Sequence, residues 1–453
     1  MRSGISVLLM CCCAATALAR EEYRRDFRKT VTLTGGRSFR VENSNGNITI
    51  NTQGKGEAQI QATIRSSADT AAEARSFGEQ IEIIVDEGGS GVSVRTRYPS
   101  SYGGNRGYSV DYDIVIPENS PLEVRNRFGA VNVSNVHAAG TINNANGRVS
   151  LTGGRGRQQI ENSFGDVEVR TNDGDLTVRN GNGAVIAADI TGTVDITNRF
   201  GRIRATNVGH GLTIHSNNGE IDAQNVGGVT LISNSFGRVT VTDMKSDVTV
   251  QNQNGQVRAT GVTGTADLHT TFDRVDVSHI GKALRVRAAN ATVVGDAVGE
   301  SATVETTFGN VELRDVKTGA RVTSANSSVR LTGIGGEAYA KTSFGGVDVN
   351  DVSGPVTVEN QNGSVTVASR PGQRCQPISV QTSFGPIRVS LPSGMGYNVT
   401  ARTSFGRIHS DEDMTVSGDF RPDSMSGKIA GGGCDLRLTG QNGSIDILKS
   451  PGR

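Results

Sequence analysis

The sequence predicts an all-β protein: a single-stranded parallel β-solenoid, or β-helix, of 18-residue units, with a short helix in an N-terminal cap. Three observations predict this fold. Phe-Gly recurs at constant steps of 36 residues, Asn-Gly recurs midway between these pairs, and apolar residues alternate with polar ones around each turn. Gly accounts for 59 of 453 residues and Trp is absent, so the core must consist of Val, Ile, Leu and Ala.

One position of the repeat alternates between Phe and Asn. Around Phe200, the apolar residues Val194, Ile196, Ile203 and Ala205 alternate with polar ones and predict two short strands per unit. A hairpin is the usual interpretation of Asn-Gly, but hairpins tolerate loops of varied length. A constant period over about fourteen units requires each unit to stack on the next, as in a solenoid. The series comprises Phe128, Asn146, Phe164, Asn182, Phe200, Asn218, Phe236, Asn254, Phe272, Asn290, Phe308, Asn326, Phe344 and Asn362.

A second series, of polar residues, lies two positions before each Phe. Stacked amides or hydroxyls can hydrogen-bond along a solenoid axis, so we expect a structural ladder, together with Phe128, Phe164, Phe200 and Phe236 as fillers of the neighbouring position. A ligand-binding row of Asn residues is the alternative. The series comprises Asn126, Asn162, Asn198 and Asn234, then Thr270, Thr306, Thr342, Thr382 and Thr403.

The number of residues per coil stays open at this stage. Eighteen residues per coil would place Phe and Asn alternately in one column, whereas 36 would give one column of each. The equivalent inward positions of both half-repeats favour eighteen. The preference of parallel crossovers favours a right-handed coil.

The chain begins with a predicted secretory signal peptide at residues 1–19. Arg2, an apolar stretch from Ile5 and the small residues Ala17 and Ala19 predict cleavage before Arg20. Cys11 leaves a lipid anchor as an alternative. No later apolar run is long enough to span a bilayer, so we expect no integral membrane segment after cleavage. The protein is therefore predicted to be exported to the periplasm, the cell surface or the medium.

The mature chain divides into three predicted regions. Residues 20–120 form an N-terminal cap with the first strands, including a helix from about Ala68 to Gln80. Residues 121–370 form the regular solenoid, and residues 371–453 form irregular coils and a C-terminal cap. Cys375 and Cys434 are the two Cys residues left after signal removal, and an even pair in an exported protein predicts a disulfide.

Two groups of residues are candidates for ligand binding. Tyr98, Tyr102 and Tyr108, interleaved with Arg97 and Arg106 on a Gly-rich loop, could stack on sugar rings and pair with anions; a plain loop is the alternative.

The second group is a row of arginines at 36-residue steps. Arg202, Arg238 and Arg274 could contact an anionic glycan, or they could belong to a solvated charged stripe.

Catalytic chemistry has little support in the sequence. A polysaccharide lyase or hydrolase would need acidic or basic residues that interrupt the repeat on one face. The repeat deviates near His269 and His279, where Asp273 and later Ala291 and Ser327 replace the turn Gly. A functional cleft is one interpretation, and drift of the repeat, with Asp tolerated in a tight turn, is the favoured one. We predict no catalytic residues, no metal and no cofactor. A net charge of +1 argues against a nucleic-acid partner.

Several segments resemble one family. "SFRVENSNGNITI", "VDYDIVIPENSPLEVRNRFGAVNVSNV", the Asn-Gly and Phe-Gly units and the C-terminal "GQNGSIDI" are similar to the bacterial "putative adhesin" family of exported β-solenoid domains of unknown function. The resemblance implies the fold and an envelope location and supplies no catalytic residues. We therefore expect a non-enzymatic cell-envelope scaffold that presents repetitive faces to a surface glycan or an envelope protein. A polysaccharide-active enzyme and an envelope-stress accessory protein are the alternatives, and the oligomeric state stays open.

Overall fold

The computed structural model describes residues 20–34, 36–99, 106–369, 375–417 and 421–450. The predicted signal peptide, including Cys11, and Tyr102 lie outside these residues. The described chain is nearly all β, with one short helix, which confirms the predicted fold class. It divides into two compact units, one comprising residues up to Ala138 with Ile142–Gly147, the other comprising Ala139–Thr141 and the chain from Arg148 onward.

The strands of the N-terminal unit mix parallel and antiparallel pairing. They are β1 (Glu21–Thr32), β2 (Ser38–Asn45), β3 (Ile48–Gln53), β4 (Glu57–Ala68), β5 (Glu82–Gly88), β6 (Gly91–Arg97), β7 (Gly107–Pro117), β8 (Leu122–Phe128) and β9 (Val131–Ser134). Strand β4 pairs antiparallel with both β1 and β7, while β3 pairs parallel with β7 and β9. Strand β2 pairs parallel with β6 and β8, and β5 pairs antiparallel with β6.

The predicted helix is present as α1 (Ala71–Glu79). Its first turn is capped by Thr70, whose Oγ1 accepts a hydrogen bond from the Glu73 backbone N–H, while the Glu73 carboxylate accepts one from the same hydroxyl at 3.0 Å. This reciprocal arrangement satisfies a backbone donor that the helix itself leaves free. No helix in the described residues is long and apolar enough to cross a membrane.

The remaining strands follow the repeat. β10 (Gly140–Asn146) contains the boundary between the units. The regular strands are β11 (Val149–Arg155), β12 (Gln158–Phe164), β13 (Val167–Asp173), β14 (Leu176–Asn182), β15 (Val185–Ile190), β16 (Val194–Phe200), β17 (Ile203–Val208), β18 (Leu212–Asn218), β19 (Ile221–Val226), β20 (Thr230–Phe236), β21 (Val239–Met244), β22 (Val248–Asn254) and β23 (Val257–Val262). They continue as β24 (Ala266–Ile280), β25 (Leu284–Val298), β26 (Ser301–Phe308), β27 (Val311–Val316), β28 (Gly319–Asn326), β29 (Val329–Ile334), β30 (Glu337–Phe344), β31 (Val347–Val352), β32 (Val356–Asn362) and β33 (Val365–Ala368). The C-terminal strands are β34 (Ile378–Phe384), β35 (Ile387–Leu391), β36 (Tyr397–Arg402), β37 (Ile408–Ser410), β38 (Met414–Val416), β39 (Ser424–Ile429), β40 (Cys434–Asn442) and β41 (Ile445–Lys449).

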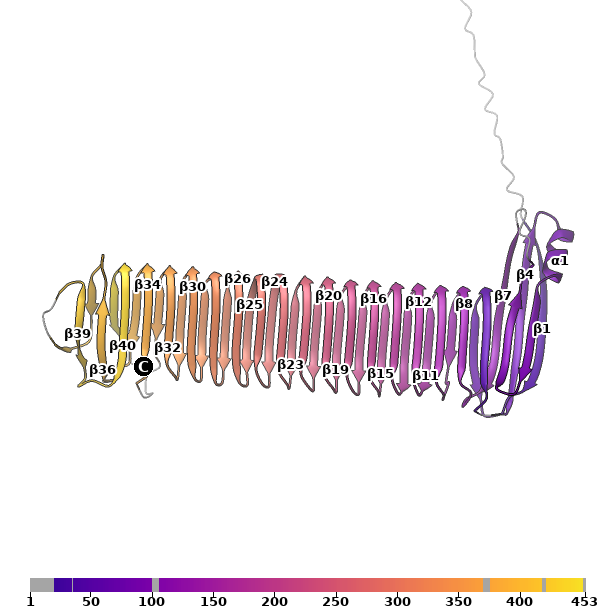
Figure 1. Ribbon diagram of the computed structural model, residues 1–453, viewed down its shortest axis with the longest axis horizontal. Helices are drawn as coiled ribbons and strands as arrows, with labels where there is room; N and C mark the ends of the chain where they lie inside the picture. Colours follow the sequence, from indigo (N-terminus) through magenta and orange to yellow (C-terminus); the bar gives the residue numbers. More distant parts are fainter. Residues whose placement is uncertain (1–19, 35, 100–105, 370–374, 418–420, 451–453) are drawn as a thin grey trace, which may run out of the picture. The chain divides into compact units, whose positions relative to one another are not determined.

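Each regular coil of the solenoid contains 18 residues. Strand β16 pairs in parallel with β14 and β18, and the register places Phe200 beside Asn182 on one side and Asn218 on the other. Strand β17 pairs in the same way with β15 and β19. Figure 1 shows the strands of the second unit lying side by side. The solenoid has about 15 turns. Phe and Asn therefore alternate in one column, which settles the coil length; the handedness of the coil stays a prediction.

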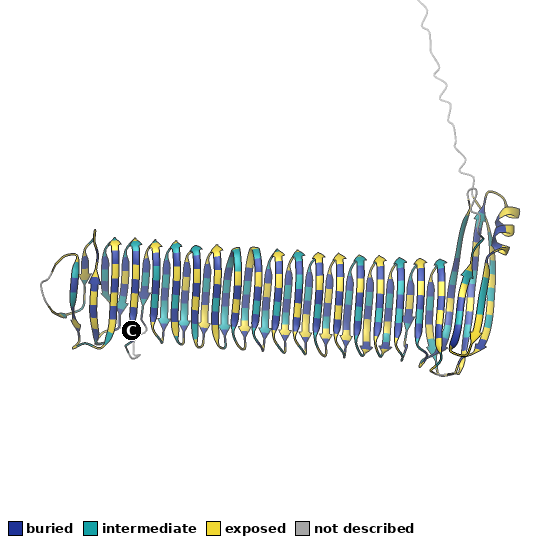
Figure 2. Cartoon of the chain, in the orientation of Figure 1, coloured by how far each residue is buried: buried dark blue, intermediate teal, exposed yellow. Residues whose placement is uncertain are grey.

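The core lies between the two strands of each coil. In the coil around Phe200, Val194, Ile196, Ile203 and Ala205 are each at most 2% exposed. The alternation of buried and exposed residues along each strand is visible in Figure 2. One coil cannot enclose its apolar face alone, so each layer depends on its neighbours for burial.

The C-terminal coils do not stack in the order in which they occur in the sequence. Strand β40 pairs parallel with β34 on one side and with β36 on the other, so the last full coil lies between two coils that precede it in the sequence. Strand β39 pairs antiparallel with β36. Cys375 and Cys434 form a disulfide with a Cα–Cα distance of 5.8 Å, which joins the segment before β34 to the start of β40.

Candidate binding surface along one edge of the solenoid

A glycine turn forms the first corner of most coils. Gly237 has φ +119°, and a Cβ at this position would lie 2.3 Å from the carbonyl oxygen of Gly219 in the preceding coil. The position therefore excludes a side chain for two reasons, a left-handed backbone and close approach of the next layer. The residue before each glycine ends its strand at this corner and lies on the edge of the solenoid.

A polar column lies just inside this edge. Asn198 is 1% exposed, and its Nδ2 donates to the carbonyl oxygens of Gly183 at 3.0 Å, Phe200 at 3.3 Å and Gly201 at 3.3 Å. The amide thus binds the turn of its own coil and that of the preceding coil. Asn126, Asn162 and Asn234 donate to turn carbonyls in the same way, and Asn234 also donates to Oδ1 of Asn252 at 3.2 Å.

The residues predicted from the sequence are every second member of this column. The intervening coils hold Asn180, Asn252 and Asn360, which bind turn carbonyls in the same way. An 18-residue search for Asn at the same offset would have found them. In later coils Thr takes the position, and Thr270 Oγ1 donates to the Phe272 carbonyl at 3.1 Å.

The phenylalanines of the repeat lie on the surface. Of the twelve Phe residues in the described part of the chain, nine are exposed, including Phe128 in the N-terminal unit. The other eight occupy one column of the solenoid, in which successive members are separated by one Asn coil. We call this column the Phe edge; its phenylalanines are Phe164, Phe200, Phe236, Phe272, Phe308, Phe344 and Phe384, which are 47–57% exposed, and Phe405, which is 76% exposed. The asparagines between them are Asn182, Asn218, Asn254, Asn290, Asn326, Asn362 and Asn442.

Phe164, Phe200 and Phe236 were predicted to fill the position beside the polar ladder. The structure instead leaves about half of each side chain in contact with solvent. Since adjacent layers of a parallel sheet are about 4.8 Å apart, rings on every second layer stand roughly 9.6 Å apart, too far to stack on one another. The Phe edge is thus a row of separate aromatic rings with an amide between each pair.

The arginine row carries compensating acids. Arg202 and Arg238 both form ion pairs with Glu220, the second at 3.7 Å, and Arg274 pairs with Asp276 at 2.6 Å. The hydrogen bond and charge of Arg202 hold the pKa of Glu220 below its usual value. The row is therefore a stripe of ion-paired side chains.

The tyrosine group packs within the N-terminal unit. The Tyr98 hydroxyl donates to Oδ1 of Asn43 at 2.7 Å, and burial raises the Tyr98 pKa to about 12. The Tyr98 and Tyr108 rings lie 4.8 Å apart, and Arg106 lies over the Phe77 ring at 5.6 Å. Arg97 forms an ion pair with Glu82. These described members therefore contact one another and the cap.

The deviating coil does not gather its polar residues. In β24, His269 follows the buried Leu268 on one strand segment, Asp273 lies at the turn with φ 88°, and His279 has φ 58° near the end of the strand. The Asp276 carboxylate accepts hydrogen bonds from Gln256 Nε2 at 2.8 Å and from Arg274 Nε at 2.6 Å. Among the described residues, no group of three His, Cys, Asp or Glu side chains could hold a metal ion.

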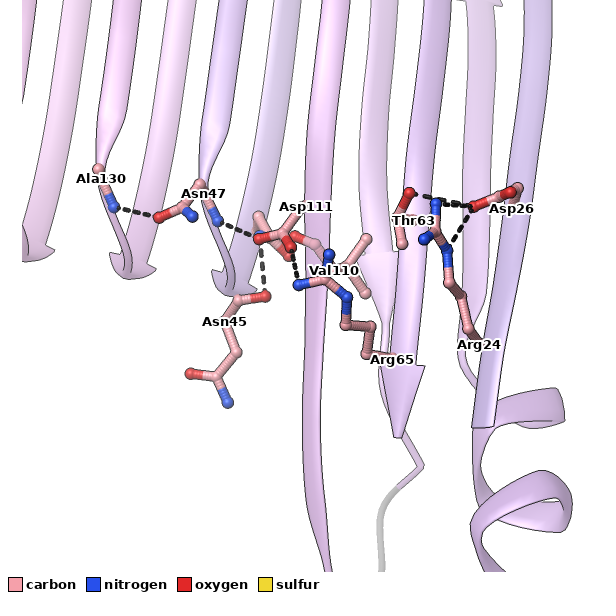
Figure 3. Close-up of polar contacts among 10 residues, drawn as sticks. Arg24, Asp26, Asn45, Asn47, Thr63, Arg65, Val110, Asp111 and Ala130 are labelled. Carbon is pink, nitrogen blue, oxygen red and sulfur yellow. Dashed lines mark hydrogen bonds and ion pairs between the residues drawn. The ribbon is translucent and has the colours of Figure 1, made fainter. Parts of the chain in front are cut away.

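The N-terminal unit has a polar groove of about 540 Å³ over β1, β4 and β7. Asp111 accepts hydrogen bonds from Arg65 Nη1 at 3.0 Å and from the Asn47 backbone N–H at 2.8 Å (Figure 3). Asp26 accepts one from Thr63 Oγ1 at 3.1 Å, and this bond lowers the Asp26 pKa. Both carboxylates thus stabilise neighbouring strands.

A second side-chain ladder lies at the opposite corner of the coils, and the sequence reasoning missed it. Asn225 donates to Asn207 at 2.9 Å, and Asn207 donates to Asp189 at 2.7 Å. All three have positive φ, between 54° and 58°, a conformation that Asn and Asp tolerate better than most residues. The recurrence of Asn or Asp at 18-residue steps was the sequence signal that could have predicted this ladder.

The family model Toastrack DUF4097 matches residues 206–448, more than half of the chain. The chain belongs to this family. The match confirms the resemblance to adhesin-like β-solenoid proteins of unknown function. The Toastrack match spans coils from β17 to β41 and includes the Phe edge from Phe236 onward. No curated protein matches the chain.

Three solved structures are similar to this Toastrack chain at low identity. A "putative cell adhesion protein" from Clostridium sporogenes is 9% identical, with a TM-score of 0.17, over 94% of this chain and 100% of its own. A "putative adhesin" from Parabacteroides merdae is 12% identical, with a TM-score of 0.18, over 62% and 96%. A "putative lipid binding protein" from Parabacteroides distasonis is 10% identical, with a TM-score of 0.16, over 80% and 96%. At these scores the likenesses carry no argument about function.

Proposed function

We propose that the protein is a non-enzymatic, exported binding scaffold of the cell envelope, and that the Phe edge is its docking surface for a surface glycan or an envelope protein. One observation carries the proposal: eight exposed phenylalanines lie in one column of the solenoid. Scattered exposed apolar residues are ordinary, but aligned ones are typical of interaction surfaces.

The alternation of the Phe edge persists where the chain order does not. Phe384 and Phe405 both lie beside Asn442, which belongs to a strand inserted from the end of the sequence. Simple duplication of a 36-residue unit would not place an Asn coil there. The spatial pattern therefore supports a role for the edge as a continuous surface.

A catalytic alternative would need several acidic or basic groups converging on one face. In the described residues, His269, Asp273 and His279 occupy separate segments of one coil, and Asp276 is bound by its neighbours. This dispersal supports a scaffold. The pattern of residues 1–19 and the Cys375–Cys434 disulfide support an oxidising compartment outside the cytoplasm.

The proposal is tested by fractionation of cells and by binding of the purified chain to washed envelope fragments. A triple variant, Phe200→Ser, Phe236→Ser and Phe272→Ser, removes the centre of the Phe edge. A matched control, Val229→Ser with Leu231→Ser, removes two side chains of similar exposure, 47% and 46%, elsewhere on the coils.

We expect the wild type and the control to bind envelope fragments and the triple variant to lose most binding, with unchanged thermal unfolding. Equal binding by all three proteins would contradict the proposal. Recovery of the protein from the cytoplasm alone would contradict export.

A further inference from the structure

We infer that the ligand of the Phe edge is a neutral, extended, β-1,4-linked polysaccharide that lies along the edge, with every second sugar ring stacked on a phenylalanine. This inference rests on the proposed function, because it names the ligand of the same surface. It depends on the spacing of the rings, the chemistry between them and the charge around them.

The spacing matches a polymer with a two-sugar repeat. Phenylalanines on every second layer are roughly 9.6 Å apart, a distance close to the two-sugar repeat of a β-1,4-linked chain in its extended form. In such a chain alternate rings are turned over, so every second ring presents the same apolar face. A straight chain would therefore stay close to register over several successive repeats, whereas a coiled α-1,4-linked chain would not.

The chemistry of the edge fits both sides of a sugar. A phenyl ring offers an apolar face for the C–H groups of a pyranose, and an amide offers a donor and an acceptor for hydroxyl groups. The amides of Asn182, Asn218 and Asn290 lie exposed between successive rings. The coils of these three residues each present a hydrogen-bonding group beside the stacking groups. The other asparagines of the edge are half-buried, and Asn362 donates to the Ser343 carbonyl at 3.4 Å.

The residues that directly precede the edge positions are almost all uncharged. There are fifteen of them, and Arg199 is the one charged residue among them. The others are Ser163, Gly181, Asn217, Ser235, Gln253, Thr271, Ala289, Thr307, Ala325, Ser343, Gln361, Ser383, Gln441 and Ser404. Beyond the turn, Arg202 and Arg238 share an ion pair with Glu220. The surroundings favour a hydroxyl-rich neutral ligand over an anionic one.

The interposed amides also discriminate against apolar occupants. A lipid surface, or the Phe edge of a second copy, would cover the asparagines with apolar groups and leave their amides without hydrogen-bond partners, which is unfavourable. Sugar hydroxyls satisfy these amides. We therefore favour a glycan over a membrane or self-association.

Titration calorimetry with defined oligosaccharides tests the inference. The probes are cello- and chito-oligosaccharides lengthened by two sugars at a time, with malto-oligosaccharides as α-1,4-linked controls. We expect the affinity for one or both β-1,4-linked series to rise roughly three- to tenfold with each added pair of sugars, as a further ring is engaged. The malto series should not bind.

Variants connect the length dependence to the edge. Phe236→Ser should remove about one such step for the longest ligands, Phe236→Tyr should retain it, and the Val229→Ser, Leu231→Ser control should not change it. Thermal unfolding of each variant shows that its coils are intact.

The outcomes separate the inference from the proposed function. Affinity independent of length, or equal binding of the malto series, would overturn the inference. Envelope binding that depends on the Phe edge without binding of either β-1,4-linked series would overturn the inference and leave the proposed function standing. Phe-dependent dimers in sedimentation, or Phe-dependent binding to neutral lipid vesicles, would overturn the glycan ligand in favour of those occupants. If the wild type binds neither the oligosaccharides nor the envelope fragments, both proposals are overturned.

Discussion

Asn442 lies beside Phe384 in the parallel pairing of β40 with β34, although the two residues are far apart in sequence. On its other side Asn442 pairs with Phe405. The Phe–Asn alternation is thus a property of the stacked coils in space. It brings the last full coil of the chain into the same edge as the regular repeats.

The glycine turn predicts different costs for two adjacent alanine substitutions. Gly345 has φ +113°, and a Cβ there would lie 2.4 Å from the Ser327 carbonyl oxygen, whereas a Cβ at Gly346 would meet nothing closer than 3.5 Å. We expect Gly345→Ala to destabilise the coils by about 2 kcal/mol or more and Gly346→Ala by less than about 1 kcal/mol. Urea unfolding monitored by circular dichroism measures both. Equal losses would contradict the role of the turn.

The buried amide predicts that a hydroxyl can replace it but a methyl group cannot. Asn198→Thr should retain a donor to the turn, as Thr270 does to the Phe272 carbonyl. Asn198→Val leaves the Phe200 and Gly201 carbonyls without their side-chain donor. We expect the Val variant to be less stable than the Thr variant by about 1–3 kcal/mol. The two side chains have nearly the same shape, so thermal unfolding of the pair isolates the hydrogen bond. Indistinguishable stabilities would show that the column only fills space.

The disulfide predicts a local loss of stability when both cysteines are removed. The Cys375→Ala, Cys434→Ala variant frees the start of β40, the strand that lies between β34 and β36. We expect a loss of about 2–4 kcal/mol confined to the C-terminal coils, seen as earlier proteolysis after residue 370. Wild type treated with a reductant is the control and should behave like the variant. Unchanged proteolysis would contradict this account.

Acid should weaken the ion pairs of Glu168 with Arg148 and Arg170 on the surface of the coils. Hydrogen bonds from Arg170 and Arg148 hold the pKa of Glu168 below its usual 4.5. A lowered folded-state pKa means that the contribution is fully present above pH 4.5 and is lost as the pH falls through the lowered value. We expect Glu168→Gln to be less stable than wild type near neutral pH, with the difference vanishing in acid. A difference in melting temperature that does not change with pH would contradict this.

The fold could be predicted because its signal repeats. The 18-residue alternation of apolar residues, the Gly turns and the polar column all depend on local sequence, and the structure has the predicted solenoid and the helix near Ala71. The coil length stayed open because Phe and Asn share one position, and strand pairing was needed to place Phe200 beside Asn218. The insertion of β40 between earlier coils depends on tertiary pairing that no local pattern reveals.

The surface was harder to predict than the stack. A regular Phe is usually interpreted as core, and its exposure follows from its place at the end of a strand, where the Gly turn begins. Tyr98 and Arg202 drew attention as recognition residues, but a single sequence does not show that Asn43 and Glu220 lie beside them. Candidate binding residues therefore need the partners that the fold brings near.

The central claim is that ligands contact the Phe edge, and site-specific photo-crosslinking tests it most directly. A photoreactive phenylalanine replaces Phe236 in one protein and Leu231 in another; these side chains are 52% and 46% exposed and lie on the same strand, β20. After binding to envelope fragments and irradiation, we predict crosslinked envelope material from position 236 and little from position 231. Equal crosslinking at both positions, or crosslinking at 231 alone, would contradict the account.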